Sequence, residues 1–130
     1  MQFELAVKAA REAGHSNVRF QVADALTLPF PENYFDVVHC RAVLMHIPNT
    51  MAVLAEIKRV LKPWGILGAR EWIGDSTFIE PHFGNLNRIP TMISEMFSAN
   101  GGHPQIGKEL RARFYETGLV DVEANGAFES

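Results

Sequence analysis

The chain has 130 residues, of which 47% are hydrophobic and 21% charged, and its formal net charge is -3. This composition excludes disorder, collagen and coiled coil, and it predicts a single domain over residues 1–130 with one core. The 12 lysines and arginines are scattered, so we expect neither nucleic acid nor a membrane surface as a partner. A lone cysteine, Cys40, and the absence of a long apolar run predict a cytoplasmic protein.

The first third of the chain alternates between helical and extended patterns. Apolar residues at helical spacing, followed by Gly14, predict a helix over residues 2–13. Alternating apolar and polar residues predict a half-buried strand over 17–23. After a loop with two prolines, the run "YFDVVHC" predicts a second, more buried strand over 34–40.

The middle of the chain carries the clearest amphipathic pattern. It predicts a helix over residues 50–61, with Asn49 or Thr50 as its cap and with Pro63 and Gly65 ending it. The run "ILGAREW" then predicts a third strand, over residues 66–72.

The last third predicts two more helices and a final strand. A helix near 86–99 contains Pro90, which marks either a kink or the true first turn. A second helix is expected over 106–117, closed by Gly118, and a strand over 119–128. Strands that alternate with helices in this way predict an α/β fold, with a mostly parallel sheet flanked by helices and a ligand crevice at the carboxyl ends of the strands.

Asp24 follows the first predicted strand and opens the loop "DALTLPFP". A carboxylate beside a free backbone N–H can hold the amino group and a ring nitrogen of an adenine. The alternative is that Asp24 satisfies the backbone of its own loop, which is the commoner role of such aspartates.

Four features occur in a fixed order: the acidic and small residues before "LPFP", the "FDVV" strand, the "VLMHIP" turn and the "RVLKPWG" helix end. Together they resemble the central part of class I S-adenosylmethionine-dependent methyltransferases, particularly the ubiquinone/menaquinone-biosynthesis-like branch. The run "NGGHPQIGKELRARFYETGLVDVE" extends the resemblance nearly to the carboxyl terminus. The resemblance implies a Rossmann-like fold, S-adenosyl-L-methionine as the methyl donor, and methyl transfer to a small-molecule acceptor.

The same resemblance implies roles for three residues at the predicted strand ends. Asp24 would accept a hydrogen bond from the adenine amino group, and the amide of Ala25 would meet an adenine ring nitrogen. Arg41 falls where the family lines the pocket near the methionine part of the donor. For Arg41, an ion pair at a helix start is the alternative.

Three further residues are candidates on the acceptor side. His46 is suited to act as a general base if the acceptor is a hydroxyl. We favour a packing role, since alignment of the donor's methyl group with the acceptor can supply most of the rate. Glu71 and Trp72 follow the third strand and could line a substrate pocket. The alternatives are a surface salt bridge between Arg70 and Glu71, and Trp72 as a cover of the core.

Two other patterns have common structural explanations. Met92, Ile93, Met96 and Phe97 form a stripe at helical spacing, for which core packing is the usual explanation and a substrate lid the alternative. The cysteine and the histidines show no recognised ligand spacing, so we expect no metal site.

The sequence departs from the family in one element. It contains no Gly-x-Gly-x-Gly turn after a strand, and Met1 aligns near the helix after the second strand, so we expect a partial domain without the first two strands. With strands about 4.8 Å apart, this leaves a gap of roughly 14 Å between the predicted strands 17–23 and 34–40. Exposed sheet edges then favour self-association or a complementing partner. We expect impaired donor binding and, as the alternative function, a non-catalytic remnant that acts as a protein-interaction module.

Overall fold

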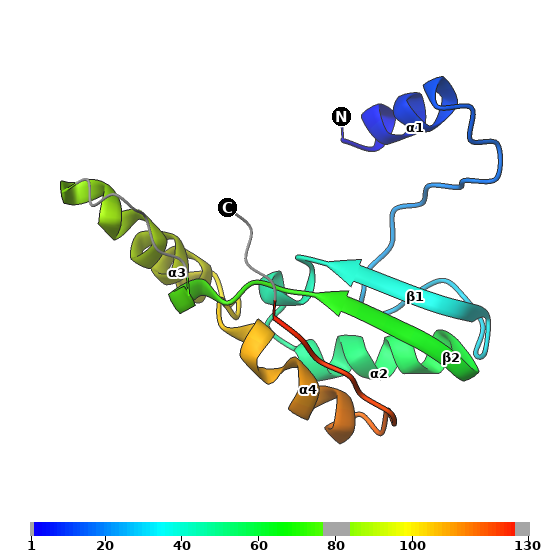
Figure 1. Ribbon diagram of the computed structural model, residues 1–130. Coiled ribbons are helices and arrows are strands. Elements are labelled where there is room, and N and C mark those ends of the chain that lie inside the picture. Colours follow the sequence, from blue (N-terminus) through cyan, green and yellow to red (C-terminus); the bar gives the residue numbers. More distant parts are fainter. Residues whose placement is uncertain (1, 77–83, 127–130) are drawn as a thin grey trace.

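The computed structural model describes residues 2–76 and 84–126 (Figure 1). In chain order the elements are helix α1 (Gln2–Glu12), strand β1 (Phe35–Arg41), the 3-10 turn η1 (Leu44–His46), helix α2 (Thr50–Val60), strand β2 (Leu61–Arg70), the 3-10 turns η2 (Gly74–Ser76) and η3 (Gly84–Arg88), helix α3 (Ile89–Ala99) and helix α4 (Ile106–Glu116).

The sheet consists of β1 and β2, which run parallel, with α2 as the crossover between them. The ladder is regular from the pair Val37 and Ile66 to the pair Arg41 and Arg70. Before Val37 the register is irregular, since Phe35 pairs with Leu61, and the extra residues of β2 include Trp64, whose φ is +69°. This parallel pair places the carboxyl ends of both strands at one edge, as the sequence predicts.

Helix α2 covers one face of the two strands (Figure 1). It begins where predicted, because the side chain of Asn49 accepts a hydrogen bond from the N–H of Ala52 at 3.1 Å. Its buried side chains recur at helical spacing and include Val53, Leu54, Ile57 and Val60. The amphipathic pattern therefore predicted both the helix and the face that it buries.

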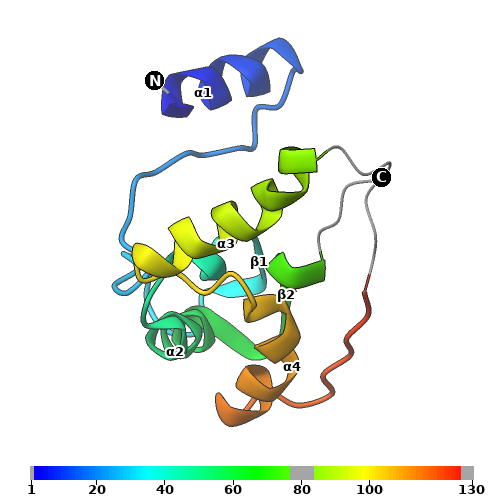
Figure 2. The ribbon, with the colours of Figure 1, turned by 90° about the vertical axis from the view of Figure 1, so that its left-hand side faces the viewer.

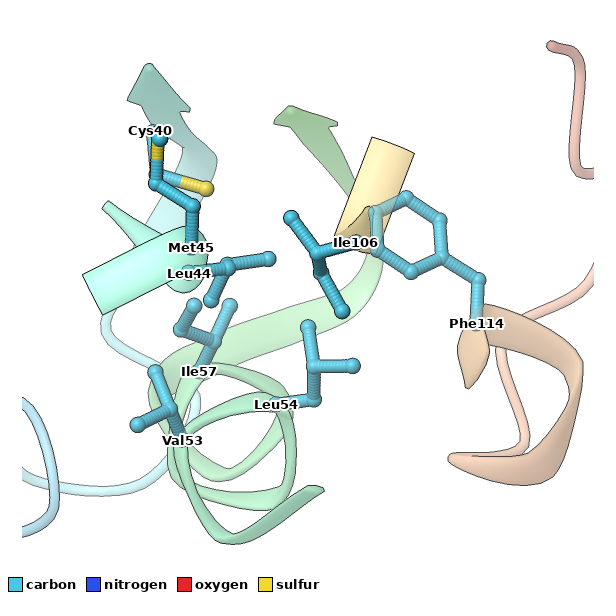
Figure 3. Close-up of a cluster of buried hydrophobic side chains, with 8 residues drawn as sticks. All are labelled: Cys40, Leu44, Met45, Val53, Leu54, Ile57, Ile106 and Phe114. Carbon is cyan, nitrogen blue, oxygen red and sulfur yellow. The ribbon is translucent and has the colours of Figure 1, made fainter. Parts of the chain in front are cut away.

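The core lies between the sheet, η1, α2 and α4 (Figure 3). Its buried members are Cys40, Leu44, Met45, Val53, Leu54, Ile57, Ile106 and Phe114. Burial, and secondarily the nearby charge of Glu71, raises the pKa of the Cys40 thiol to about 11. The thiol is thus protonated at neutral pH and contributes to the core as a small apolar side chain.

The two helices after the sheet follow the sequence prediction. Pro90 occupies the first turn of α3. The prediction that it marks the first turn of the helix is therefore confirmed, and the alternative of a kink is wrong. Helix α4 ends before Gly118, which takes a positive φ of +81°. A glycine is favoured there because an L side chain rarely adopts that conformation.

Two predicted strands are wrong. Residues 17–23 are irregular and largely exposed, with Val22 at 84% exposure, and they join the sheet to α1, which lies apart from it (Figures 1 and 2). Residues 119–126 are likewise not a strand, and 127–128 lie outside the described residues. A strand is defined by its ladder, and in the described part of the chain neither segment has a neighbour with which to form one.

Candidate functional site

The carboxyl ends of β1 and β2 are held together by Glu71, the first residue after β2. Its Oε1 accepts hydrogen bonds from the N–H groups of Val43 and Leu44, both at 3.0 Å, and its Oε2 accepts one from Met45 at 3.2 Å. The opening N–H groups of a helical turn have no partner within that turn, and a carboxylate matches both their polarity and their geometry. Glu71 therefore fixes η1 relative to β2.

The link between β1 and η1 is conformationally unusual. Ala42 has a φ of +52°, a region that L residues rarely occupy, and its N–H donates to the carbonyl of Arg70 at 2.9 Å. Arg41, the last residue of β1, is exposed and lies opposite Arg70 in the ladder. Two guanidinium groups thus lie at the strand ends, on the face of the sheet away from Cys40 and the core.

His46 and Trp72 come together around Phe97 of α3. The imidazole centroid of His46 is 4.9 Å from the ring of Phe97, and the Trp72 ring is 6.1 Å from it. Trp72 is half-buried, whereas His46 is exposed. Two candidates from different strand ends are therefore joined by one residue of the predicted stripe, and the tertiary structure alone brings them together.

Asp24 and Ala25 lie in the loop that precedes β1. The Oδ1 atom of Asp24 accepts a hydrogen bond from the N–H of Leu26 at 2.9 Å, and its carbonyl accepts one from Thr27 at 3.1 Å. This is the turn-forming role that the sequence offered as the alternative. The carboxylate is nonetheless exposed, and Ala25 packs against the buried core, so the turn presents Asp24 outward from a fixed base.

The same loop is anchored by two residues that the sequence did not single out. Arg59 of α2 binds both carboxylate oxygens of Glu56, at 2.7 and 2.8 Å, and also donates to the carbonyls of Leu28 and Phe30. Glu56 in turn accepts the N–H of Leu28 at 2.8 Å. Hydrogen bonding to Arg59 lowers the pKa of Glu56 to about 2. The spacing of three residues on a helix predicts the ion pair but not its contact with the loop.

Residues 2–76 and 84–126 hold no group of three His, Cys, Asp or Glu side chains arranged to bind a metal ion. None of the helices described above is long and apolar enough to cross a membrane.

Comparison with known proteins places these features in a family. Residues 2–69 match a family model described as a methyltransferase domain. The uncharacterized methyltransferase YcgJ of Bacillus subtilis is 34% identical over 108 residues, which are 75% of this chain and 43% of that protein. The sterol 24-C-methyltransferase ERG6B of Gibberella zeae is 39% identical over 67 residues, which are 52% of this chain and 18% of that protein.

Solved structures match the fold as well. The crystal structure of YcgJ superposes with a TM-score of 0.62 at 25% identity, over 88% of this chain and 47% of that chain. The [4+2]-cyclase SpnF matches with a TM-score of 0.51 at 36% identity, over 56% of this chain and 31% of that chain. The fold is thus the predicted partial Rossmann-like α/β fold, and the chain spans less than half the length of each of these relatives.

Proposed function

Because this chain belongs to the class I S-adenosylmethionine-dependent methyltransferase family, we propose that it binds S-adenosyl-L-methionine and takes part in methyl transfer to a small-molecule acceptor. The family's cofactor is that donor, which supplies an electrophilic methyl group on a cationic sulfonium. The observation that carries the proposal is the parallel strand pair, whose carboxyl ends carry Arg41, η1 and Trp72 within the matched fold.

The described residues have the chemistry that the donor requires. The exposed carboxylate of Asp24 suits the amino group of an adenine, and the amide of Ala25 suits a ring nitrogen. The guanidinium of Arg41 suits the carboxylate of the donor's methionine part. The sequence has no Gly-x-Gly-x-Gly turn to receive that part closely, so we expect the chain alone to bind the donor weakly.

Isothermal titration calorimetry with S-adenosylhomocysteine tests the donor site without knowledge of the acceptor. The sharpest variant is Asp24→Asn, because the amide oxygen can still accept the N–H of Leu26 and preserve the turn, while the second oxygen becomes a donor. Asp36→Asn is the matched control, since Asp36 is an exposed aspartate paired with Lys62 on β2. We expect saturable binding that Asp24→Asn weakens at least tenfold and Asp36→Asn preserves. No heat of binding from a folded sample contradicts the proposal.

The alternative function is a non-catalytic interaction module, and the face of the sheet away from the core supports it. On that face Val37 and Ile66 are ladder partners with 59% and 65% exposure. Side chains of this kind are usually covered in a parallel sheet. Light scattering coupled to size exclusion separates the two functions: a monomer that binds S-adenosylhomocysteine favours the enzyme, and a self-associating chain without binding favours the module. Ile66→Lys should then restore the monomer.

A further inference from the structure

A hollow of about 240 Å³ lies between η1 and the carboxyl-terminal half of α3. It is lined by His46, Met96, Phe97, Asn100 and Gly102. Because η1 begins three residues after the end of β1 and Phe97 contacts Trp72 after β2, the hollow lies at the same end of the sheet as Arg41. In the part of the chain that the structure describes, a second hollow, of about 370 Å³, is lined by residues of α1 only.

The two walls of the smaller hollow are fixed to each other by backbone contacts. The N–H of His103 donates to the carbonyl of Met45 at 2.8 Å, and that of Gly102 to the carbonyl of Phe97 at 2.9 Å. A Cβ atom on Gly102 would lie 2.6 Å from the Met45 oxygen, closer than real contacts allow. Only glycine lets the turn after α3 approach η1 this closely, so the hollow is preformed.

The exposure of its lining does not suit simple core packing. Met96 is 56% exposed, and His46 and Asn100 are exposed as well. Core packing, the usual explanation for the stripe on α3, would have buried Met96. Phe97 is half-buried against the core and lines the hollow beside the exposed Met96 and His46. A soft thioether and the accessible part of an aromatic ring beside an imidazole form a surface for a flat apolar ligand.

The size and chemistry of the hollow limit the ligand. Its volume lies below the roughly 300–1,000 Å³ of pockets for drug-sized ligands, so it fits one small ring system or one end of a larger molecule. Phe97 offers a ring for stacking, and His46, beside Phe97, offers the one titratable side chain among the described residues of the lining for a hydrogen bond.

We propose that this hollow is the acceptor site, and that it takes a planar aromatic molecule with a hydroxyl group that hydrogen-bonds to His46. That the bound molecule is a methyl acceptor rests on the proposed function, whereas the binding of an aromatic alcohol is inferred from the hollow alone. Its site residues, Met96, Phe97 and His46, lie outside the contacts that Asp24 and Ala25 make.

The probe is 2-naphthol, added to the 130-residue chain with ¹³C in its methionine methyl groups, without any methyl donor. We expect the Met96 methyl resonance to shift upfield and saturate as the naphthol ring approaches, while that of Met51, on α2, stays in place. Phe97→Leu should weaken the affinity about two- to tenfold, the range for one lost aromatic pair. Met92→Leu, on the same helix but outside the lining, is the matched control and should leave the affinity unchanged.

A second comparison isolates the hydrogen bond. His46→Leu should weaken 2-naphthol but not naphthalene, which has the same ring system and no hydroxyl. The proposal is overturned if the Met96 resonance of the folded protein does not move, or if it moves together with that of Met51 and without saturation. It is also overturned if His46→Leu weakens the affinities for 2-naphthol and naphthalene equally. Titration of the same sample with S-adenosylhomocysteine tests the proposed function separately, because either ligand can bind while the other fails.

Discussion

Replacement of Glu71 should destabilise the whole domain, although its side chain lies at the edge of the sheet. Glu71→Ala removes three hydrogen bonds, of 3.0, 3.0 and 3.2 Å, from the N–H groups of residues 43–45. The Val43 contact is exposed and water can replace it, but the contacts of Leu44 and Met45 are partly buried. At about 1–3 kcal/mol for each of these two partly buried donors left unpaired, we expect a loss of about 2–6 kcal/mol in the free energy of unfolding.

A less disruptive variant, Glu71→Gln, removes the charge of the carboxylate and keeps the shape of the side chain. Glu71→Gln keeps one oxygen that can accept from Val43 and Leu44, but it turns an N–H₂ group toward the N–H of Met45. We expect it to cost about 1.5–3 kcal/mol, roughly one charge-assisted hydrogen bond. Urea unfolding followed by circular dichroism measures both variants. Glu116→Gln, an exposed position at the end of α4, is the matched control and should stay within about 0.5 kcal/mol of the wild type.

The effect of Glu71→Gln can also be measured independently, through the pKa of the Cys40 thiol. The charge of Glu71 is one of two causes that raise the pKa of this thiol, after burial. Titration of the thiolate absorbance should therefore give a lower pKa in Glu71→Gln than in the wild type. If Glu71→Ala unfolds within about 0.5 kcal/mol of the wild type, which is the usual effect of a surface substitution, the carboxylate does not hold η1 and the reasoning is refuted.

Other predictions follow from single contacts. The folded-state pKa of Glu56, about 2, lies below its ordinary value of 4.5. The contribution of its charge to stability is therefore complete above about pH 4.5 and is lost as the pH falls toward 2. In Glu56→Gln, the free energy of unfolding should depend less on pH in that range. Cys40, which is 8% exposed and has a pKa of about 11, should react with iodoacetamide at pH 8 only after unfolding; rapid labelling of the native protein would contradict its burial. Gly102→Ala places a Cβ 2.6 Å from the Met45 carbonyl, and we expect a loss of about 1–3 kcal/mol on thermal unfolding, which a variant of exposed Gly126 should not show.

Local patterns in the sequence predicted the elements that are defined by residues within or next to the element itself. Helix α2 has an N-cap at Asn49 and an apolar face, and both are readable from spacing alone. The run "YFDVVHC" likewise predicted β1 through its β-branched and aromatic residues. The burial expected for this strand is wrong, because only Cys40 is buried and Val37 is 59% exposed. The four ordered motifs indicated the family through a resemblance, and the match of residues 2–69 to a methyltransferase domain confirms it.

Tertiary structure decided what depends on a partner distant in the chain. Residues 17–23 have the alternation of a strand, but a strand also needs a neighbour, which the sequence pattern of one segment does not contain. Glu71 binds residues 43–45, and Arg59 binds the loop that contains Phe30, over 26 or more residues of sequence. The residue types around one partner of such a hydrogen bond do not identify the other partner. The hollow beside Phe97 exists because η1 and α3 meet at Gly102. Local propensity is a property of neighbouring residues, whereas a site is formed by contacts that only folding creates.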